Sequence, residues 1–133
     1  GLQTSDLRLP TYYFLILSAM QIDPTSRIAI MYFDHEMARR AGGTYEDTEG
    51  IINLPLTVKE IQAVVFFKHA EGDEYRVSMR SKGNIDIGSV AKEFGGGGHK
   101  NAAGCTVTGP IDALQKTFIE KIEEAIDGRS AHR

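Results

Sequence analysis

The residues best suited to do chemistry lie between Phe94 and Gly104, where the sequence reads FGGGGHKNAAG. Four consecutive glycines allow either sign of φ, so successive backbone N–H groups can converge on one anion, as they also do where a helix begins. His99 can donate hydrogen bonds, carry a charge or stack on a base, while Lys100 adds a cation and Asn101 an amide. The pattern favours an anion site built from backbone, and the alternative is a tight turn or surface loop.

This glycine run does not match the two common glycine-rich nucleotide motifs. The P-loop pattern GxxxxGK[ST] fits no register, because His99 is the residue before Lys100. The GxGxxG pattern of dinucleotide folds requires a strand directly before it, whereas residues 86–94 are expected to form a helix.

A second polar set lies on the strand that alternation predicts over residues 74–81. One face of this strand is apolar, and the other carries Arg76, Ser78, Arg80 and, if the strand persists, Lys82. A guanidinium fork beside a hydroxyl suits a phosphate oxygen, and the alternative is a solvated strand face. A glycine run and an arginine strand in one small chain together favour a phosphate or nucleotide site.

The remaining patterns predict the elements that must position these residues. Residues 61–69 are apolar on both alternating faces, which indicates a central strand, and a turn joins them to strand 74–81 in a hairpin. Further strands are expected over 27–33 and 104–108. Helices are predicted over 10–22, 34–41, 45–54, 86–94 and 112–127. This order predicts an α/β (mixed α+β) fold: a single small domain with a central mixed β-sheet flanked by helices.

Length, net charge, cysteine content and hydropathy limit the kinds of protein that this chain can be. The 133 residues suit one domain, and a net charge of −3 argues against binding nucleic acid through bulk positive charge. The single Cys105 allows no internal disulfide, and with no secretory signal visible we expect a cytoplasmic location. The apolar run YYFLIL at 12–17 is shorter than the roughly 20 residues of a membrane span, so no membrane partner is expected. We expect it to be buried, or covered by another domain.

Three stretches resemble one known family. VSMRSKG at 77–83 and IGSVAKEFGGGGHKNAAG at 87–104 are similar to the DHH-associated domain, the C-terminal substrate-binding domain of DHH phosphoesterases. TYEDTEGIINLPL at 44–56 resembles the oligoribonuclease and adenosine-bisphosphate phosphatase branch. The resemblance suggests three segments: an N-terminal apolar helix or linker from the catalytic domain at 1–26, the DHH-associated domain at 27–128, and a tail at 129–133.

The resemblance implies the substrate-gripping half of a manganese-dependent phosphoesterase that hydrolyses short oligonucleotides, dinucleotides or bisphosphorylated nucleosides. An N-terminal DHH domain would hold two manganese ions that activate water. Because that domain is missing here, we expect no catalytic residue, metal ligand or cofactor in this chain, and no catalysis by it alone. The implied partners are short RNA, a dinucleotide or a bisphosphorylated nucleoside, the DHH domain of the same protein, and a second copy in a homodimer.

The resemblance also assigns binding residues by position. Arg80 and Ser81 would contact phosphate, and the nucleotide would be held by Gly96, Gly97, Gly98 and His99, with Lys82 and Asn101 as further candidates. Strand alternation disagrees about Ser81, because it places this side chain on the face opposite Arg80.

The remaining histidines and the cysteine are expected to have structural or surface roles. Asp34-His35-Glu36 is not the catalytic DHH motif in its context, and structural or surface roles are expected for His35, His69 and His132. Cys105 is expected to pack as a small hydrophobe. Two alternatives remain: a nucleic-acid-binding module, since similar domains accompany alanyl-tRNA synthetases, and an oligomerisation module that uses the apolar N-terminal segment.

Overall fold

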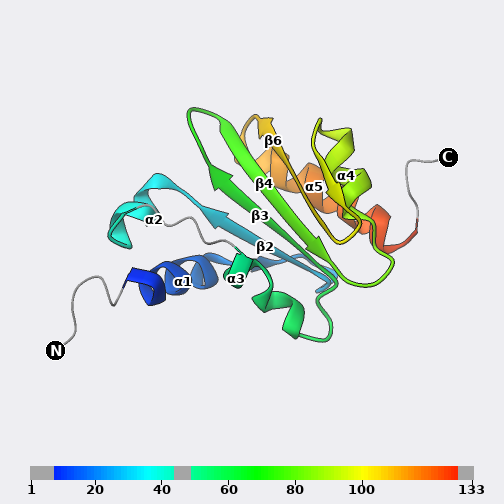
Figure 1. The fold of residues 1–133 in the computed structure, drawn as a ribbon, viewed down its shortest axis with the longest axis horizontal. Helices are drawn as coiled ribbons and strands as arrows, with labels where there is room; N and C mark the ends of the chain where they lie inside the picture. The colour runs from blue at the N-terminus through cyan, green and yellow to red at the C-terminus, as the bar shows by residue number, and fades with distance from the viewer. Residues whose placement is uncertain (1–7, 44–48, 129–133) are drawn as a thin grey trace.

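A six-stranded mixed sheet forms the centre of the computed structural model, which describes residues 8–43 and 49–128 (Figure 1). The strand order is β1-β2-β3-β4-β6-β5, and only β2 and β3 pair in parallel. The strands are β1 (Gln21–Ile22), β2 (Ile28–Phe33), β3 (Ala63–His69), β4 (Glu74–Ser81), β5 (Gly97–His99) and β6 (Ala102–Thr108). The predicted single α/β domain with a mixed central sheet is confirmed.

Helices lie on both sides of this sheet (Figure 1). They are α1 (Arg8–Ala19), α2 (His35–Arg40), α3 (Glu49–Ile52), the 3-10 helix η2 (Leu54–Thr57), α4 (Ile87–Glu93) and α5 (Ile111–Ile126). Within the described residues, no helix is both long and apolar enough to cross a membrane.

The sheet separates two hydrophobic cores. On one face, α4 and α5 pack against all the long strands through residues such as Val65, Val77 and Phe118. On the other face, α1, α2 and α3 pack against β2 and β3 through residues such as Ile16 and Phe66. Alternation explains this division, because successive residues of a strand point to opposite faces. β3 is buried on both faces, as its sequence predicted.

The predicted helix over 10–22 is wrong at its C-terminal end. Helix α1 stops at Ala19, and Gln21 and Ile22 pair with β2 as a short antiparallel strand. The tight turn that follows makes this pairing possible, because the Asp23 carboxylate accepts hydrogen bonds from the backbone N–H groups of Thr25, Arg27 and Ile28. A helical pattern in the sequence does not reveal such a side-chain-stabilised turn.

The apolar run at 12–17 contributes to the second core. Tyr12 and Ile16 are fully buried, whereas Phe14 is 66% exposed, so one side of α1 packs on the sheet and the other does not. The division of the chain at residue 27 into a linker and a domain stays a prediction. In the described structure α1 and β1 both pack on the same sheet as the later elements.

Two other predicted elements differ from the structure. Residues 45–48 of the helix expected over 45–54 lie outside the described residues, and the rest divides into α3 and η2, with Pro55 in the first turn of η2. The glycine run was expected to be a loop, an anion nest or a helix start, yet Gly97–His99 forms strand β5, antiparallel to β6. Glycines have no side chains to alternate, so the sequence pattern could not show this strand.

Asp23 gives a first test of this fold. Burial of its carboxylate raises the pKa, but the hydrogen bonds from the Thr25 hydroxyl and from the N–H groups of Ile28, Thr25 and Arg27 outweigh burial and lower it. Asp23→Asn should therefore reduce the free energy of unfolding at pH 7 by about 1.5–3 kcal/mol, the scale of hydrogen bonds to a charged group.

The pH dependence follows from the sign of the shift. A carboxyl with a lowered folded-state pKa stabilises above its unfolded value, about 3.9, and loses that contribution as pH falls through the folded-state pKa. The difference in the free energy of unfolding between the wild type and Asp23→Asn, measured by urea unfolding, should be smaller at pH 3 than at pH 7. Asp73→Asn, in the exposed β3–β4 turn, serves as the control. An equal difference in the free energy of unfolding at both pH values would contradict the role given to the carboxylate.

Candidate functional site

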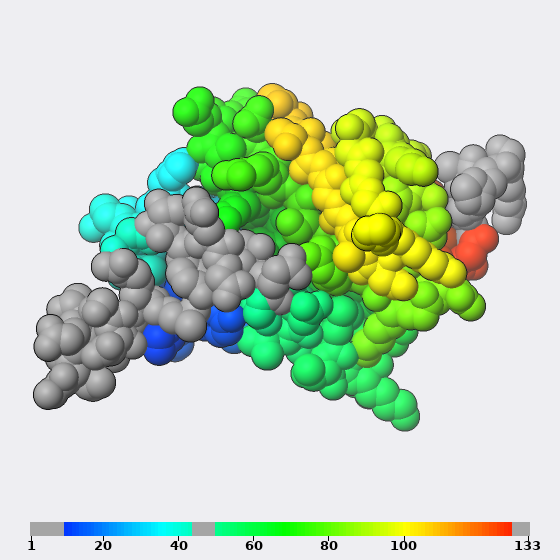
Figure 2. Space-filling model, in the orientation of Figure 1, coloured from blue at the N-terminus to red at the C-terminus, as the bar shows by residue number. Residues whose placement is uncertain are grey.

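The candidate site lies on the same sheet face as the core formed by α1, α2 and α3, but on the strands beyond that core. We call it the open face, and it consists of the β4, β6 and β5 side chains that point to the same side as Phe66 of β3. The pairing register places on it Arg76, Ser78 and Arg80 of β4, Ala102, Gly104 and Thr106 of β6, and Gly97 and His99 of β5. Figure 2 looks onto this side, where the β5–β6 hairpin, in yellow, lies at the surface.

Two cross-strand rows bring the predicted residues together. Arg80 pairs with Ala102, which pairs in turn with His99, so the arginine and the histidine flank a small residue. Two strand spacings put their Cα atoms roughly 10 Å apart. The next row runs from Ser78 through Gly104 to Gly97 and has almost no side-chain volume. On the open face, small residues therefore lie between Arg80 of β4 and His99 of β5.

The predicted polar face of the arginine strand is confirmed as far as Arg80. Arg80 is half-buried, and its guanidinium donates to the Met79 carbonyl oxygen at 2.8 Å. Lys82 does not continue this face, because β4 ends at Ser81. The Lys82 ammonium instead donates to the carbonyl oxygen of Val58 at 2.9 Å, which ties the end of β4 to the segment after η2.

Close backbone contact explains two of the glycines. A Cβ on Gly96 would collide with the Gly104 carbonyl oxygen and lie 2.8 Å from the Cα of Cys105. Gly98 has a φ of +140°, and a Cβ there would lie 2.6 Å from the Ala102 carbonyl oxygen. The β5 and β6 backbones could not approach this closely with side chains at these positions.

Gly97 is different from its neighbours. A Cβ there would meet nothing within 4 Å, and its φ is not among the positive values. Its register partner Gly104 lies on the open face, so a side chain at Gly97 would also lie on the open face. Neither a neighbouring atom nor a positive φ in the described chain requires a glycine at this position.

Helix α4 holds the turn between β5 and β6. The Asp86 carboxylate caps this helix by accepting hydrogen bonds from the Ser89 hydroxyl and the Ser89 N–H, and its pKa is lowered chiefly by the hydroxyl. The Ile87 N–H donates to the Lys100 carbonyl oxygen at 2.9 Å. A Cβ on Gly88 would lie 2.8 Å from the His99 carbonyl oxygen, so this glycine lets the helix start reach the turn.

Ser81 and Asn101 form an internal network behind the turn. Ser81 is buried, on the face opposite Arg80 as alternation indicated, and its hydroxyl donates to the Ile85 carbonyl oxygen at 2.6 Å. The Asn101 amide donates to the Ser81 hydroxyl at 2.9 Å, and it also lies within hydrogen-bond distance of the carbonyl oxygens of Gly83 and Ile85. These contacts join the loop after β4 to the turn before β6. Direct contact of either side chain with substrate stays a prediction.

His132 lies outside the described residues, and the other polar residues singled out in the sequence lie away from these rows. His35 and His69 form an edge-to-face pair with ring centroids 5.0 Å apart, and each ring lies within hydrogen-bond distance of a backbone carbonyl oxygen. Burial raises the pKa of the Cys105 thiol to about 11, so it packs as an apolar group at neutral pH. Across residues 8–43 and 49–128, no group of three or more His, Cys, Asp or Glu side chains is placed to hold a metal.

The network predicts a structural role for Asn101 that can be measured without a ligand. Asn101→Ala removes the donors to Ser81, Gly83 and Ile85 and should lower the free energy of unfolding by about 1–3 kcal/mol in urea titrations. Asn84→Ala is the comparison: it removes one exposed hydrogen bond, which Asn84 accepts from Lys100 of the same turn, and it should cost less than Asn101→Ala. If Asn101→Ala is as stable as the wild type, the network does not stabilise the turn.

The two classes of glycine predict opposite outcomes for the same substitution. Gly98→Ala should destabilise the fold by about 1–3 kcal/mol, because it adds a clash and forces alanine into a strained φ. Gly97→Ala should change the free energy of unfolding by less than about 0.5 kcal/mol. Thermal unfolding of both variants provides the comparison, and equal destabilisation would show that the two positions do not differ as described.

Comparison with known proteins gives one consistent family. The bifunctional oligoribonuclease and PAP phosphatase NrnA of Thermus thermophilus is 32% identical over 85 residues, which cover 63% of this chain and 26% of that protein. NrnA of Bacillus subtilis is 30% identical over 79 residues, or 59% of this chain and 25% of that protein. Each match therefore spans about a quarter of the relative's length.

A solved structure of an exopolyphosphatase-related protein from Bacteroides fragilis superposes with a TM-score of 0.77 at 26% identity, covering 93% of this chain and 35% of that one. The sequence profile of the DHHA1 domain matches residues 26–128. The resemblance stated from the sequence is thus confirmed, with distant homology to NrnA and to the DHH phosphoesterases. This chain belongs to the DHHA1 domain family.

Proposed function

We propose that this chain is the substrate-binding half of a phosphoesterase, and that its open face holds a phosphate and the adjoining nucleoside of a short oligonucleotide, a dinucleotide or a bisphosphorylated nucleoside. The observation that carries the proposal is the cross-strand row of Arg80, Ala102 and His99 beside the uncovered Gly97. Membership of the DHHA1 family and the homology to NrnA support it.

Each group on the face has a chemical task in this proposal. The Arg80 guanidinium carries a permanent charge and a planar fork of donors that fits phosphate oxygens. His99 is exposed at the edge of the sheet, where its ring can stack on the base of the ligand. Gly97 and Gly104 remove side-chain volume between them, so the ligand can lie against the backbone.

The reaction itself belongs to the rest of the protein in this proposal. A DHH domain of the same polypeptide would supply two manganese ions, whose chemistry is to activate a water for attack on phosphorus. The chain described here would contribute binding and orientation: Arg80 neutralises charge on the phosphate, and His99 holds the adjoining nucleoside. In this proposal the DHH domain supplies the rest of the binding surface, so the domain described here should bind the ligand weakly on its own.

Amide NMR titrations of this chain test the proposal. A 5′-phosphorylated diadenosine nucleotide should shift the amides of 95–101 and 78–80, and inorganic polyphosphate should shift fewer of them because it has no base. His99→Ala should weaken nucleotide binding about tenfold or more, as expected when base stacking is lost, and should leave polyphosphate binding unchanged. No shift with millimolar nucleotide would overturn the proposed function.

Two variants separate the charge from the backbone. Arg80→Gln should lower the affinity for both the dinucleotide and polyphosphate about tenfold or more, since a charge-assisted hydrogen bond is lost. Gly97→Ala should lower the affinity for the dinucleotide by a similar factor, while the free energy of unfolding stays nearly unchanged. Lys116→Gln, on the exposed side of α5, is the control for a lost positive charge. Normal nucleotide affinity in a folded Gly97→Ala protein would contradict close approach at that position.

A further inference from the structure

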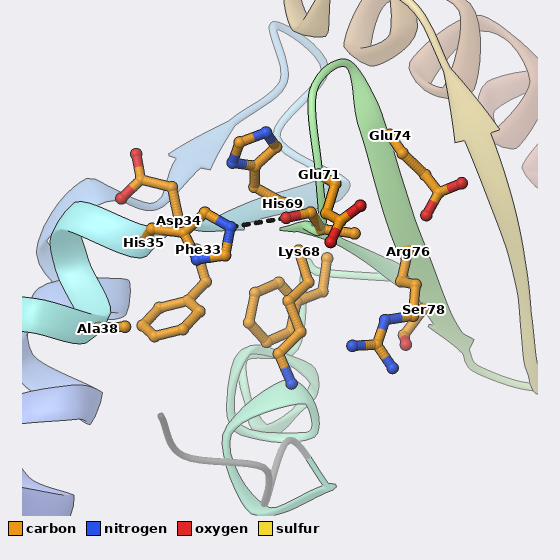
Figure 3. Close-up of a pocket in the computed structure, with 12 residues that line it drawn as sticks. Phe33, Asp34, His35, Ala38, Lys68, His69, Glu71, Glu74, Arg76 and Ser78 are labelled. Carbon is orange, nitrogen blue, oxygen red and sulfur yellow. Dashed lines mark hydrogen bonds between the residues drawn. The ribbon is translucent and has the colours of Figure 1, made fainter. Parts of the chain in front are cut away.

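Ser78 of β4 lies where the open face meets a cleft of about 800 Å³, and it lines both (Figure 3). Figure 3 shows its side chain extending from β4 on the same side as that of Arg76. The residue is half-buried, so its hydroxyl has lost part of its contact with solvent and is still open to the cleft. A molecule bound on the open face can therefore reach this hydroxyl.

The Ser78 hydroxyl is not used by the fold. Among the residues that the structure describes, none forms a hydrogen bond with it. Two other serine hydroxyls are engaged internally: Ser81 donates to the Ile85 carbonyl oxygen at 2.6 Å, and Ser89 donates to the Asp86 carboxylate at 2.8 Å. A half-buried hydroxyl without a protein partner loses hydration and gains no hydrogen bond in return. A ligand group that both donates and accepts would supply the missing bond.

The strand register places Ser78 beside the position proposed for the sugar of the ligand. Ser78 pairs with Gly104, which pairs with Gly97, so Ser78 is the member of this row that has a side chain. The neighbouring row holds Arg80 and His99, and its Cα atoms lie roughly 7 Å further along the strands. The ribose of a nucleotide joins its phosphate to its base. With the phosphate at Arg80 and the base at His99, the ribose would lie over the small residues between them, next to the row of Ser78.

The hydrogen-bonding capacity of a serine hydroxyl matches that of a ribose hydroxyl. A serine hydroxyl has one donor and two acceptor sites, and the 2′-hydroxyl of a ribonucleotide also donates and accepts. An ionised phosphate oxygen only accepts, and the Arg80 guanidinium already offers a fork of donors to it. The 2′-hydroxyl is also the group by which a protein distinguishes RNA from DNA at a given position. A serine next to the ribose can therefore select the sugar.

We propose that the Ser78 hydroxyl forms a hydrogen bond with the ribose 2′-hydroxyl of the nucleoside held between Arg80 and His99, and that this contact makes the open face prefer ribonucleotides to deoxyribonucleotides. The contact rests on the proposed function and adds the class of sugar to it. Two polar residues of β4 then have separate tasks, because Arg80 binds the phosphate and Ser78 distinguishes the sugar.

Titrations of this chain with two matched ligands test the contact. The probes are the 5′-phosphorylated diadenosine nucleotide and its 2′-deoxy form, which lacks the 2′-hydroxyl groups. The wild type should bind the ribonucleotide about fivefold more tightly, the scale of one neutral hydrogen bond. Ser78→Ala should lower the affinity for the ribonucleotide about fivefold and leave the affinity for the deoxynucleotide within about twofold. The two losses should not add, because either change removes the same hydrogen bond.

The controls separate this contact from the proposed function. Ser18→Ala, at an exposed position of α1, should leave both affinities unchanged, and circular dichroism should show each variant folded. The contact would be overturned by a wild type that binds both ligands equally, or by an unchanged ribonucleotide preference in Ser78→Ala. An equal loss of affinity for both ligands in Ser78→Ala would also overturn it, since the hydroxyl would then act on a group that they share. These results would leave the Arg80–His99 site intact, whereas a wild type that binds neither ligand at millimolar concentration would overturn both proposals.

Discussion

The candidate site depends on how closely the backbones of β5 and β6 approach each other. Side chains at Gly96 or Gly98 would collide with backbone atoms of β6, so this pairing exists only without them. The pairing also sets the register, and a shift of one residue would move His99 to the opposite face of the sheet, away from Arg80. The start of α4 holds that register, because the Ile87 N–H donates to the Lys100 carbonyl oxygen in the hairpin turn.

The two faces of the sheet differ in how many of the strands their hydrophobic cores cover. Toward α4 and α5, every long strand contributes to a single buried core. On the other side, the core stops at β3, and β4, β6 and β5 present arginines, hydroxyls and small residues instead. The first core keeps β4 and β6 in place, so the open face does not need a hydrophobic cover to keep its shape. A binding surface on paired strands is also more rigid than one on a loop.

The sequence predicted the parts of the fold that carry side-chain periodicity. Strands β3 and β4, helices α2, α4 and α5, and the polar face with Arg76 and Arg80 follow from alternation or from helical spacing. It could not predict β5, because glycines carry no pattern, or β1, because the turn at Asp23 depends on hydrogen bonds to one carboxylate.

The same limits apply to the candidate site. Arg80 and His99 were identified from their chemistry, but their common row with Ala102 appears only in the register. The distinction between Gly97 and its neighbours comes from contacts across strands, and the internal network of Ser81 and Asn101 comes from a loop that folds back on the sheet.

The single parallel pair in the sheet has a consequence for how the chain folds. β3, β4 and β6 pair antiparallel, and β3 and β4 are joined by a short turn, so contacts between them close short loops. β2 and β3 pair in parallel and need the long connection that includes α2 and α3. Since loop closure costs more entropy as the loop lengthens, we expect the β3–β4 hairpin to form early and β2 to join later. On this order of events, the arginine strand is in place before the N-terminal half of the sheet assembles beside it.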